Sequence, residues 1–321
     1  MDKSALPAIE AQGLVKRFED AVAVAGVDLR VGPGRVHGML GPNGAGKTTV
    51  LGMLMGLVRP DAGSVRLFGR TRDEHGARIL DGVAGFVESP CFYPYLSGRR
   101  NLALLADLDG GSAAGRIDES LELVDLTDHA GARVGGYSVG MRQRLGIAAA
   151  LLRAPRLLIV DEPASGLDPA GMRDMRALIS RLSDDGVTVL LSSHDMDEVD
   201  DLCDDITIMR MGRVVFDGSM EHLRAQAPDP AFRLSTNDNE RALTVARGEP
   251  GIVVTPEGDG LLVDAQREQL DAYVIALGRA DIAVRRLNLE SSALKALFFR
   301  LTEGDPEERA EPAMDVPEVV R

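Results

Sequence analysis

Long hydrophobic runs and cysteine pairs are both missing from this sequence. No run in its 321 residues approaches the roughly 18 consecutive apolar residues that a membrane-spanning helix needs, and residues 1–12 lack the apolar segment of a signal peptide. We therefore expect the chain not to form a transmembrane pathway by itself. The two cysteines, Cys91 and Cys203, lie far apart and outside any C-x-x-C pair, which favours reduced thiols in a cytosolic chain over a disulfide framework or a zinc site.

Basic residues are also in short supply, with 36 Lys and Arg against 50 Asp and Glu, for a formal net charge of −14. Nucleic acids are bound through clustered Lys and Arg, so we expect no nucleic acid partner. Anionic lipid surfaces are disfavoured for the same reason. The chain does have 45% hydrophobic residues, enough for a sizeable core. A length of 321 residues favours one large domain and one small one.

The first 218 residues alternate between strand and helix patterns, which is typical of an α/β domain. Residues 8–41 are predicted to form strands joined by turns. Helical patterns cover residues 47–58, 97–130 with a glycine-rich interruption at 110–115, 139–153 and 170–184. Strand patterns cover residues 64–68, 157–160 and 187–191. The last two are almost wholly apolar, so we expect both to lie in a parallel sheet that is covered on each face.

The pattern changes after residue 218. Residues 219–302 show the order β-α-β-β-α-β, followed by one more amphipathic helix at about 291–301. This order predicts a small ferredoxin-like α+β module as a second domain. Residues 303–321 contain seven acids and three prolines, a composition that predicts a disordered acidic tail.

A glycine-rich loop stands between the strand that ends at Leu40 and the helix that begins near Lys47. It fits the pattern G-x-x-x-x-G-K-[ST], in which backbone N–H groups and the helix N-terminus surround phosphate oxygens. In this pattern the lysine reaches the β- and γ-phosphates and the following hydroxyl binds Mg²⁺. The residues predicted to hold a nucleotide here are Gly41, Pro42, Asn43, Gly44, Ala45, Gly46, Lys47, Thr48 and Thr49.

Two acids follow the apolar strand at residues 157–160. We predict that Asp161 lies beside the phosphates and holds Mg²⁺ together with Thr48. The next residue, Glu162, would face an attacking water and act as general base. His194 follows the apolar strand at 187–191. If that strand is parallel to its neighbour, His194 emerges at the same edge of the sheet, near the γ-phosphate.

A further motif identifies the family. The segment Tyr137 to Arg144 reads Y-S-V-G-M-R-Q-R and resembles the ABC signature, which usually reads L-S-G-G-Q. Residues 165–168, S-G-L-D, resemble the D-loop, and Phe18 stands where the family places an adenine-stacking aromatic. The chain thus resembles the nucleotide-binding subunit of an ABC transporter over residues 8–218. Further nucleotide contacts carried over from this resemblance are Ser138, Val139, Gly140, Met141 and Asp168.

The resemblance implies a fold, cofactors and partners. The fold would be a P-loop NTPase ABC domain at residues 1–218, with a mixed sheet and a helical subdomain at about 88–155. ATP and Mg²⁺ would lie between the P-loop of one copy and the signature of a second copy in a head-to-tail dimer. A separate transmembrane permease would hold the dimer at the cytoplasmic face of the membrane.

The chain departs from the family pattern at the Q-loop, where Glu88 replaces the usual glutamine. We expect Glu88 to act as a metal ligand and to contribute to catalysis. The run E-S-P-C-F-Y-P-Y-L at 88–96 and the methionine in the signature resemble the bacitracin-type antibiotic-export branch. That branch implies export of a drug, an antibiotic or a lipid-like compound.

Other classes of nucleotide-binding protein fit less well. Soluble translation factors of the ABC type carry two cassettes, and chromosome ATPases insert long coiled coils between P-loop and signature; neither feature is present. No Asn-Lys-x-Asp segment is present to bind guanine, which disfavours a GTPase. An ATP-binding regulatory ABC protein without a transport role stays open as an alternative, although Glu162 and His194 argue against it.

Overall fold

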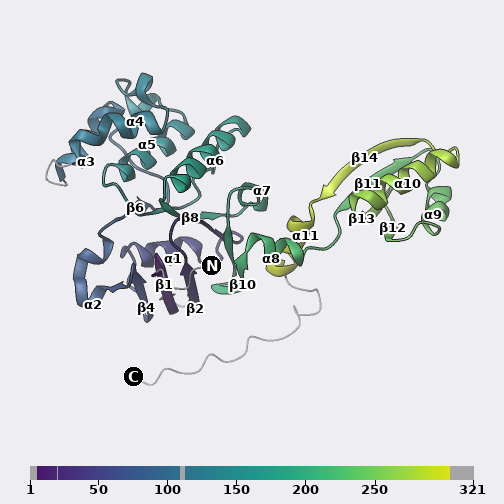
Figure 1. The fold of residues 1–321 in the computed structure, drawn as a ribbon, viewed down its shortest axis with the longest axis horizontal. Coiled ribbons are helices and arrows are strands. Elements are labelled where there is room, and N and C mark those ends of the chain that lie inside the picture. The colour runs from purple at the N-terminus through teal and green to yellow at the C-terminus, as the bar shows by residue number, and fades with distance from the viewer. Residues whose placement is uncertain (1–5, 20, 109–112, 304–321) are drawn as a thin grey trace. The chain divides into compact units, whose positions relative to one another are not determined.

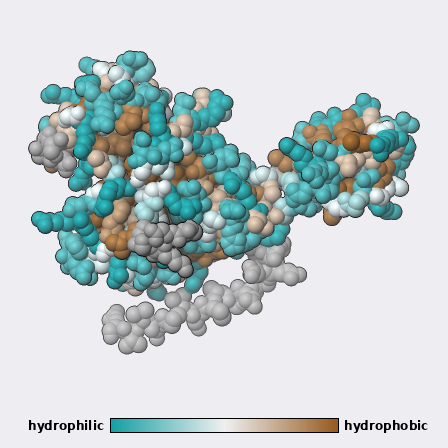
Figure 2. All heavy atoms as spheres, in the orientation of Figure 1, coloured by the Kyte–Doolittle hydropathy of each residue, from teal (hydrophilic) through white to brown (hydrophobic). Residues whose placement is uncertain are grey.

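The computed structural model describes residues 6–19, 21–108 and 113–303. The chain divides into two compact units, Met1–Met220 and Glu221–Arg321, and each unit is described by itself (Figure 1). Most of the predicted acidic tail, from residue 304 onward, lies outside the described residues. On the face drawn in Figure 2, hydrophobic residues reach the surface in separate patches among hydrophilic ones. None of the helices in the described residues is long and apolar enough to cross a membrane.

The first unit is built on a mixed six-stranded sheet with the order β10-β9-β3-β8-β7-β6. β10 is antiparallel to β9, and the other pairings are parallel. The central strands β3, β7 and β8 are buried along their whole length, which confirms the parallel, two-sided burial predicted for the apolar runs. The strands are β3 (Val36–Leu40), β6 (Val83–Phe86), β7 (Leu157–Val160), β8 (Thr188–Ser193), β9 (Asp205–Arg210) and β10 (Arg213–Ser219).

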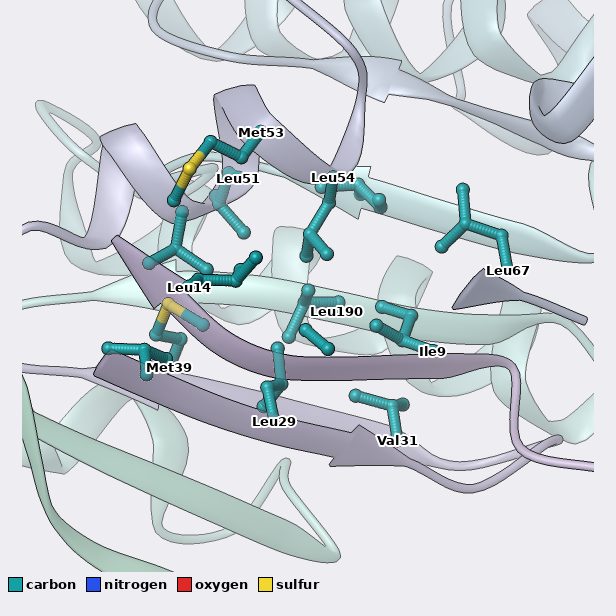
Figure 3. Packing of buried hydrophobic residues seen from close by; sticks show 14 of the residues in the cluster. Ile9, Leu14, Leu29, Val31, Met39, Leu51, Met53, Leu54, Leu67 and Leu190 are labelled. Carbon is teal, nitrogen blue, oxygen red and sulfur yellow. The ribbon is translucent and has the colours of Figure 1, made fainter. Parts of the chain in front are cut away.

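An antiparallel sheet with the order β2-β1-β4-β5 packs against the same core. Its strands are β1 (Ile9–Phe18), β2 (Ala21–Val31), β4 (Ala62–Leu67) and β5 (Arg70–Thr71). Buried side chains from this sheet, such as Ile9 and Leu29, join Met39 of β3 and Leu51 of helix α1 (Lys47–Leu54) in one hydrophobic cluster (Figure 3). Helix α1 is therefore held in place by side chains from both sheets.

Six more helices belong to this unit. They are α2 (Arg72–His75), α3 (Gly98–Leu108), α4 (Ile117–Leu123), α5 (Val139–Leu151), α6 (Pro169–Asp184) and α7 (Met196–Val199). α3, α4 and α5 pack together (Figure 1), within residues 88–155, where the helical subdomain is expected.

Two helix predictions were too long. The helix predicted at 47–58 ends at Leu54, because Gly56 adopts a left-handed conformation with φ 72°, a common way to end a helix. The helical pattern predicted at 97–130, with an interruption at 110–115, contains α3 and α4, but its last helix ends at Leu123. Beyond α4, Asp125 has φ 54° and only a 3₁₀ turn follows at Thr127–His129.

The second unit contains the predicted β-α-β-β-α-β order. Its sheet has the order β12-β13-β11-β14 with every pairing antiparallel, which is the ferredoxin-like arrangement. Helices α9 and α10 cover one face through buried side chains such as Leu234, Val263 and Tyr273. The elements are α8 (Met220–Ala225), β11 (Ala231–Thr236), α9 (Asn239–Ala246), β12 (Ile252–Glu257), β13 (Gly260–Ala265), α10 (Arg267–Arg279), β14 (Val284–Ser291) and α11 (Ala293–Glu303).

A chain of polar side chains runs from the buried His37 on β3 through the buried Thr207 on β9 to the exposed Asp217 on β10. Thr207 Oγ1 donates a hydrogen bond to Asp217 Oδ1 at 2.5 Å, so it accepts the one from His37 Nε2 at 2.8 Å. His37 Nδ1 is buried without a partner among the described residues, as suits the acceptor nitrogen of a neutral imidazole. Burial, with a smaller effect of the Arg35 charge, lowers the pKa of His37 to about 4.

Stability should therefore fall in mild acid. The folded state keeps His37 neutral down to pH about 4, whereas the unfolded chain protonates it near the ordinary histidine pKa of 6.5. Between these two pKa values the unfolded state binds more protons than the folded state. The contribution of neutral His37 to the free energy of unfolding is therefore complete above pH 6.5, and about 3 kcal/mol of it is lost by pH 4. His37→Gln, which keeps an N–H donor for Thr207, should show a shallower decline in urea unfolding from pH 7 to 4.5. His75→Gln, at an exposed histidine, is the control, and equal slopes for wild type and His37→Gln would contradict the assignment.

Candidate active site

The glycine-rich loop leaves the end of β3 and leads into α1. Gly46 has φ 101°, and a Cβ atom there would collide with the carbonyl oxygen of Ala23 on β2. A Cβ atom on Gly41 would lie 2.5 Å from the carbonyl oxygen of Met209 on β9. The loop is thus pressed against the backbones of both sheets, and only glycine fits at these two positions. Thr48 follows Lys47 on the first turn of α1 and is exposed.

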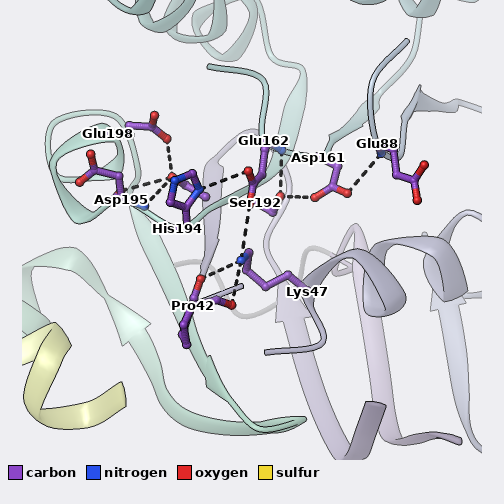
Figure 4. Close-up of polar contacts among 11 residues, drawn as sticks. Pro42, Lys47, Glu88, Asp161, Glu162, Ser192, His194, Asp195 and Glu198 are labelled. Carbon is purple, nitrogen blue, oxygen red and sulfur yellow. Dashed lines mark hydrogen bonds and ion pairs between the residues drawn. The ribbon is translucent and has the colours of Figure 1, made fainter. Parts of the chain in front are cut away.

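Lys47 is held inside this loop. Its Nζ atom donates hydrogen bonds to the carbonyl oxygens of Gly41 at 2.7 Å and Pro42 at 3.3 Å, and lies 3.6 Å from Glu162 Oε1 (Figure 4). Burial lowers the pKa of Lys47, and the carboxylates of Glu162 and Asp161 act in the opposite direction. A buried cation thus stands at the loop that would receive phosphate.

Asp161 emerges at the end of β7 and is buried. Two groups orient its carboxylate: the hydroxyl of Ser192 on β8 donates to Oδ1, and the backbone N–H of Glu88 donates to Oδ2 at 3.2 Å. The side chain of Glu88 points away from Asp161 (Figure 4). The structure therefore connects Glu88 to the site through its main chain. The sequence motifs did not indicate Ser192, although it stands only two residues before His194.

Glu162 connects the loop to the neighbouring strand. Its Oε2 lies 3.2 Å from His194 Nδ1, while its Oε1 faces Lys47. The backbone of Glu162 is left-handed with φ 45°, and its N–H donates to Ser192 Oγ at 2.9 Å. The predicted meeting of Asp161, Glu162 and His194 at one edge of the sheet is thus present in the structure.

Glu198 is a second residue that the sequence motifs did not indicate, and it supports the turn that carries His194. The Ser193 hydroxyl donates to Glu198 Oε2 on α7 and accepts from the backbone N–H of Asp195 at 3.0 Å. Burial is the main cause that raises the pKa of Glu198. These contacts tie the turn that carries His194 to the start of α7 (Figure 4).

The signature residues lie at the start of α5. Ser138 caps this helix and accepts a hydrogen bond from the N–H of Met141 at 3.2 Å. Val139 is exposed, and Gly140 lies so close to Leu167 that a Cβ atom would approach it to 3.3 Å. Among the described residues, no hydrogen bond or ion pair joins this segment to the P-loop. Its free surface is available to another molecule.

Two residues predicted to contact the nucleotide, Asp168 and Phe18, also make contacts within the chain. Asp168 caps α6 by accepting a hydrogen bond from the N–H of Gly171 at 2.9 Å. Phe18 is half-exposed at the end of β1, and Lys16 Nζ lies 5.4 Å from the centre of its ring. The exposed ring leaves a face on which a planar base can stack.

Comparisons with known proteins agree with this geometry. Residues 24–165 match a family model described as ABC transporter. The chain is 36% identical over 307 residues to the daunorubicin resistance ATP-binding protein DrrA3 of Streptomyces coeruleorubidus, covering 93% of this chain and 96% of the relative. The chain belongs to the ABC transporter ATP-binding family.

Other members of the family show the same likeness. The bacitracin transport ATP-binding protein BcrA of Enterococcus faecalis is 40% identical over 216 residues, which cover 67% of this chain and 70% of BcrA. A solved ATP-binding subunit of an ABC transporter superposes with a TM-score of 0.61 at 27% identity, covering 68% of this chain and 92% of that chain. The predicted ABC ATPase fold and the similarity to antibiotic-export ATPases are confirmed. As an ABC ATP-binding chain, the protein is an ATPase.

Ser192 offers a test of how the ABC site is held together. Ser192→Ala removes the donor to Asp161 and the acceptor for the Glu162 N–H, and we expect it to lower ATP turnover roughly tenfold or more while the protein stays folded. The measurement is steady-state ATPase activity beside the unfolding midpoint. Ser180→Ala is the control, because Ser180 is an exposed serine on α6 that contacts neither acid. Equal turnover of Ser192→Ala and wild type would show that Ser192 does not position these acids.

Proposed function

We propose that this chain is the ATP-hydrolysing subunit of an ABC exporter whose permease is a separate polypeptide. The proposal rests on the contacts of Glu162 with Lys47 and His194 at the edge of the sheet. The chain that carries this site is similar over nearly its full length to a daunorubicin resistance ATP-binding protein. The exported compound would be a drug, an antibiotic or a lipid-like molecule. The subunit would work at the cytoplasmic face of the membrane, attached through the permease.

The donor set fits Mg²⁺. The hydroxyl of Thr48 and the carboxylate of Asp161 are hard oxygen ligands, and Mg²⁺ is usually held by one or two such groups together with substrate phosphates. The bound ion would neutralise charge on the phosphates during transfer. In our proposal Thr48 and Asp161 hold this ion. The Glu88 carboxylate, an oxygen ligand in place of the family's glutamine, would need to turn from its present direction to join them.

The two contacts of Glu162 suggest how it serves hydrolysis. A phosphate bound in the loop would compete with Glu162 for the ammonium group of Lys47. His194 would then be the remaining partner of the Glu162 carboxylate. A carboxylate held in this way can accept a proton from water. His194 fixes the direction of the carboxylate, which is why we assign both residues to catalysis.

A second copy would complete the site. Ser138, Gly140 and the exposed Val139 stand at the N-terminus of the 13-residue helix α5, where free N–H groups and the helix dipole favour an anion. In a head-to-tail dimer this surface, with Met141 and Asp168, would face the ATP held by the other copy's P-loop. The exposed ring of Phe18 would stack on the adenine.

Glu162→Gln tests the assigned chemistry. The amide cannot act as general base, so turnover should fall roughly 10²–10⁴-fold, while ATP binding is kept because Lys47 and the loop are unchanged. ATP should then hold the variant as a dimer, detected by size-exclusion chromatography with and without nucleotide. Asp184→Asn, at an acid on the far end of α6, is the control. Turnover near the wild-type level in Glu162→Gln would refute the role.

A groove beside the active site is suited to the permease. Its volume is about 550 Å³, and its lining comes mostly from apolar residues of α3, α5 and the segment after β6, including Pro90, Phe92, Leu105 and Ala149. Tyr93 and Tyr95 are exposed on that segment, with ring centres 5.7 Å apart. Exposed aromatic rings next to an apolar groove are typical anchors for a partner protein, so we propose that a permease segment binds here.

Replacing both tyrosines tests this contact. Tyr93→Ala with Tyr95→Ala should weaken association with the permease roughly tenfold or more, because exposed rings contribute to binding and little to folding. Co-purification with the permease is the measurement, and nucleotide binding by the isolated subunit shows that it remains folded. Met211→Ala removes a side chain that is even more exposed, from the β9–β10 turn, and serves as control. Wild-type recovery of the complex with both tyrosines replaced would place the permease elsewhere.

A further inference from the structure

The C-terminal sheet has one edge strand that is open to pairing. β14 pairs with β11, and within the described residues no strand lies along its other side. Every residue from Val284 to Glu290 is exposed. The opposite edge strand, β12, carries Pro256, which lacks the N–H that a further strand would need. β14 has no proline, so its free N–H and C=O groups can accept another strand.

The two faces of β14 differ in character. Leu287 and Leu289 stand opposite Leu234 and Phe232 of β11, and so lie on the face covered by the helices. They are nevertheless 37% and 56% exposed, because they sit at the margin of that covered face. Arg286, Asn288 and Glu290 lie on the other, open face.

The open face carries an unbalanced cluster of charge. Arg233 donates to both carboxylate oxygens of Glu290, at 2.8 and 3.0 Å, and lies 2.9 Å from Glu257. One guanidinium thus serves two carboxylates and leaves one negative charge over. Arg286 lies nearby on β14 with no ion pair among the described residues. The open face therefore carries one net negative charge on the group formed by Glu257, Arg233 and Glu290, and one positive charge on Arg286.

The charged residues and leucines of β14 are complementary to those of a second β14 strand that runs antiparallel to it. If two β14 strands run antiparallel with Asn288 opposite Asn288 of the partner subunit, Arg286 falls opposite Glu290 of the partner subunit. Leu287 then falls opposite Leu289 of the partner subunit, and both pairs occur twice. Side chains directly opposite in a sheet share a face, so leucines meet leucines and charges meet opposite charges.

Neighbouring registers lose this match. A shift by one residue places Leu287 opposite Asn288 of the partner subunit and joins the apolar face of one strand to the polar face of the other. A shift by two leaves one leucine of each strand facing Arg285 or Ser291. The Asn288-centred register is the one that pairs all the leucines and both kinds of charge.

We propose that β14 is a self-association surface, on which β14 of a second copy of this chain adds antiparallel about Asn288 and joins the two C-terminal sheets. The contact needs no nucleotide, and so is separate from the ATP-dependent dimer proposed above. It would keep two ATPase units together between rounds of hydrolysis. Their closure around ATP then becomes an intramolecular step at high effective concentration.

Charge reversal tests the proposal with the full-length chain in the absence of nucleotide. Wild type should sediment as a dimer at micromolar concentration. Arg286→Glu places acids opposite acids and should weaken the dimer roughly tenfold or more; Glu290→Arg should do the same. Mixed in equal amounts, the two variants should form a heterodimer, because each acid then meets a base. Arg285→Glu is the matched control, since no carboxylate lies opposite it in this register.

A cysteine at the centre of the strand reports the register. In a Cys91→Ser background, with Cys203 buried, Asn288→Cys should form a disulfide between copies under mild oxidation, and Arg285→Cys should not. Binding of a fluorescent ATP analogue confirms that each variant is folded and is measured apart from assembly. A monomeric wild type, variants that dimerise as well as wild type, or equal cross-linking at 285 and 288 would each overturn the proposal.

Discussion

Parallel pairing of β3, β8 and β7 is the constraint on which the active site depends. Because the three strands run in one direction, the residues that follow them emerge at one edge of the sheet. Lys47 follows β3 across the glycine loop, His194 follows β8, and Asp161 and Glu162 follow β7. Hydrogen bonds between the ends of these strands, from Ser192 to Asp161 and from the Glu162 N–H to Ser192, convert this common edge into fixed geometry.

Residues with a strong local signal were predictable. The apolar run at 157–160 became β7, and the glycine loop, the two acids and His194 stand together as their motifs indicated. Tertiary contacts between segments distant in the sequence could not be predicted. Ser192 and Glu198 are ordinary residues in a strand and a helix, and their importance comes from what the fold places beside them. Helix ends were missed for a similar reason, since the left-handed Gly56 lies inside an apparently continuous apolar pattern.

The six-stranded sheet of the first unit and the sheet of the second unit differ in how their strand edges are used. In the first unit, the parallel strands at the centre of the mixed sheet are buried on both faces, and polar groups gather at their ends, where the active site lies. In the second unit, an antiparallel sheet with helices on one face leaves a lateral edge and an open surface. The ATPase site lies at strand ends, and the association proposed for β14 would use the side of a strand. Under that proposal, nucleotide binding and self-association would use different surfaces of the chain.

The left-handed backbone of Glu162 also has a consequence for engineering. A side chain at φ 45° costs about 1–2 kcal/mol relative to an unstrained conformation, and glycine would escape this strain. The residue that suits the backbone best is thus one without a carboxylate. With the general-base role proposed for Glu162, selection for heat resistance alone would favour a residue that lowers activity, so stability and activity would favour different residues here.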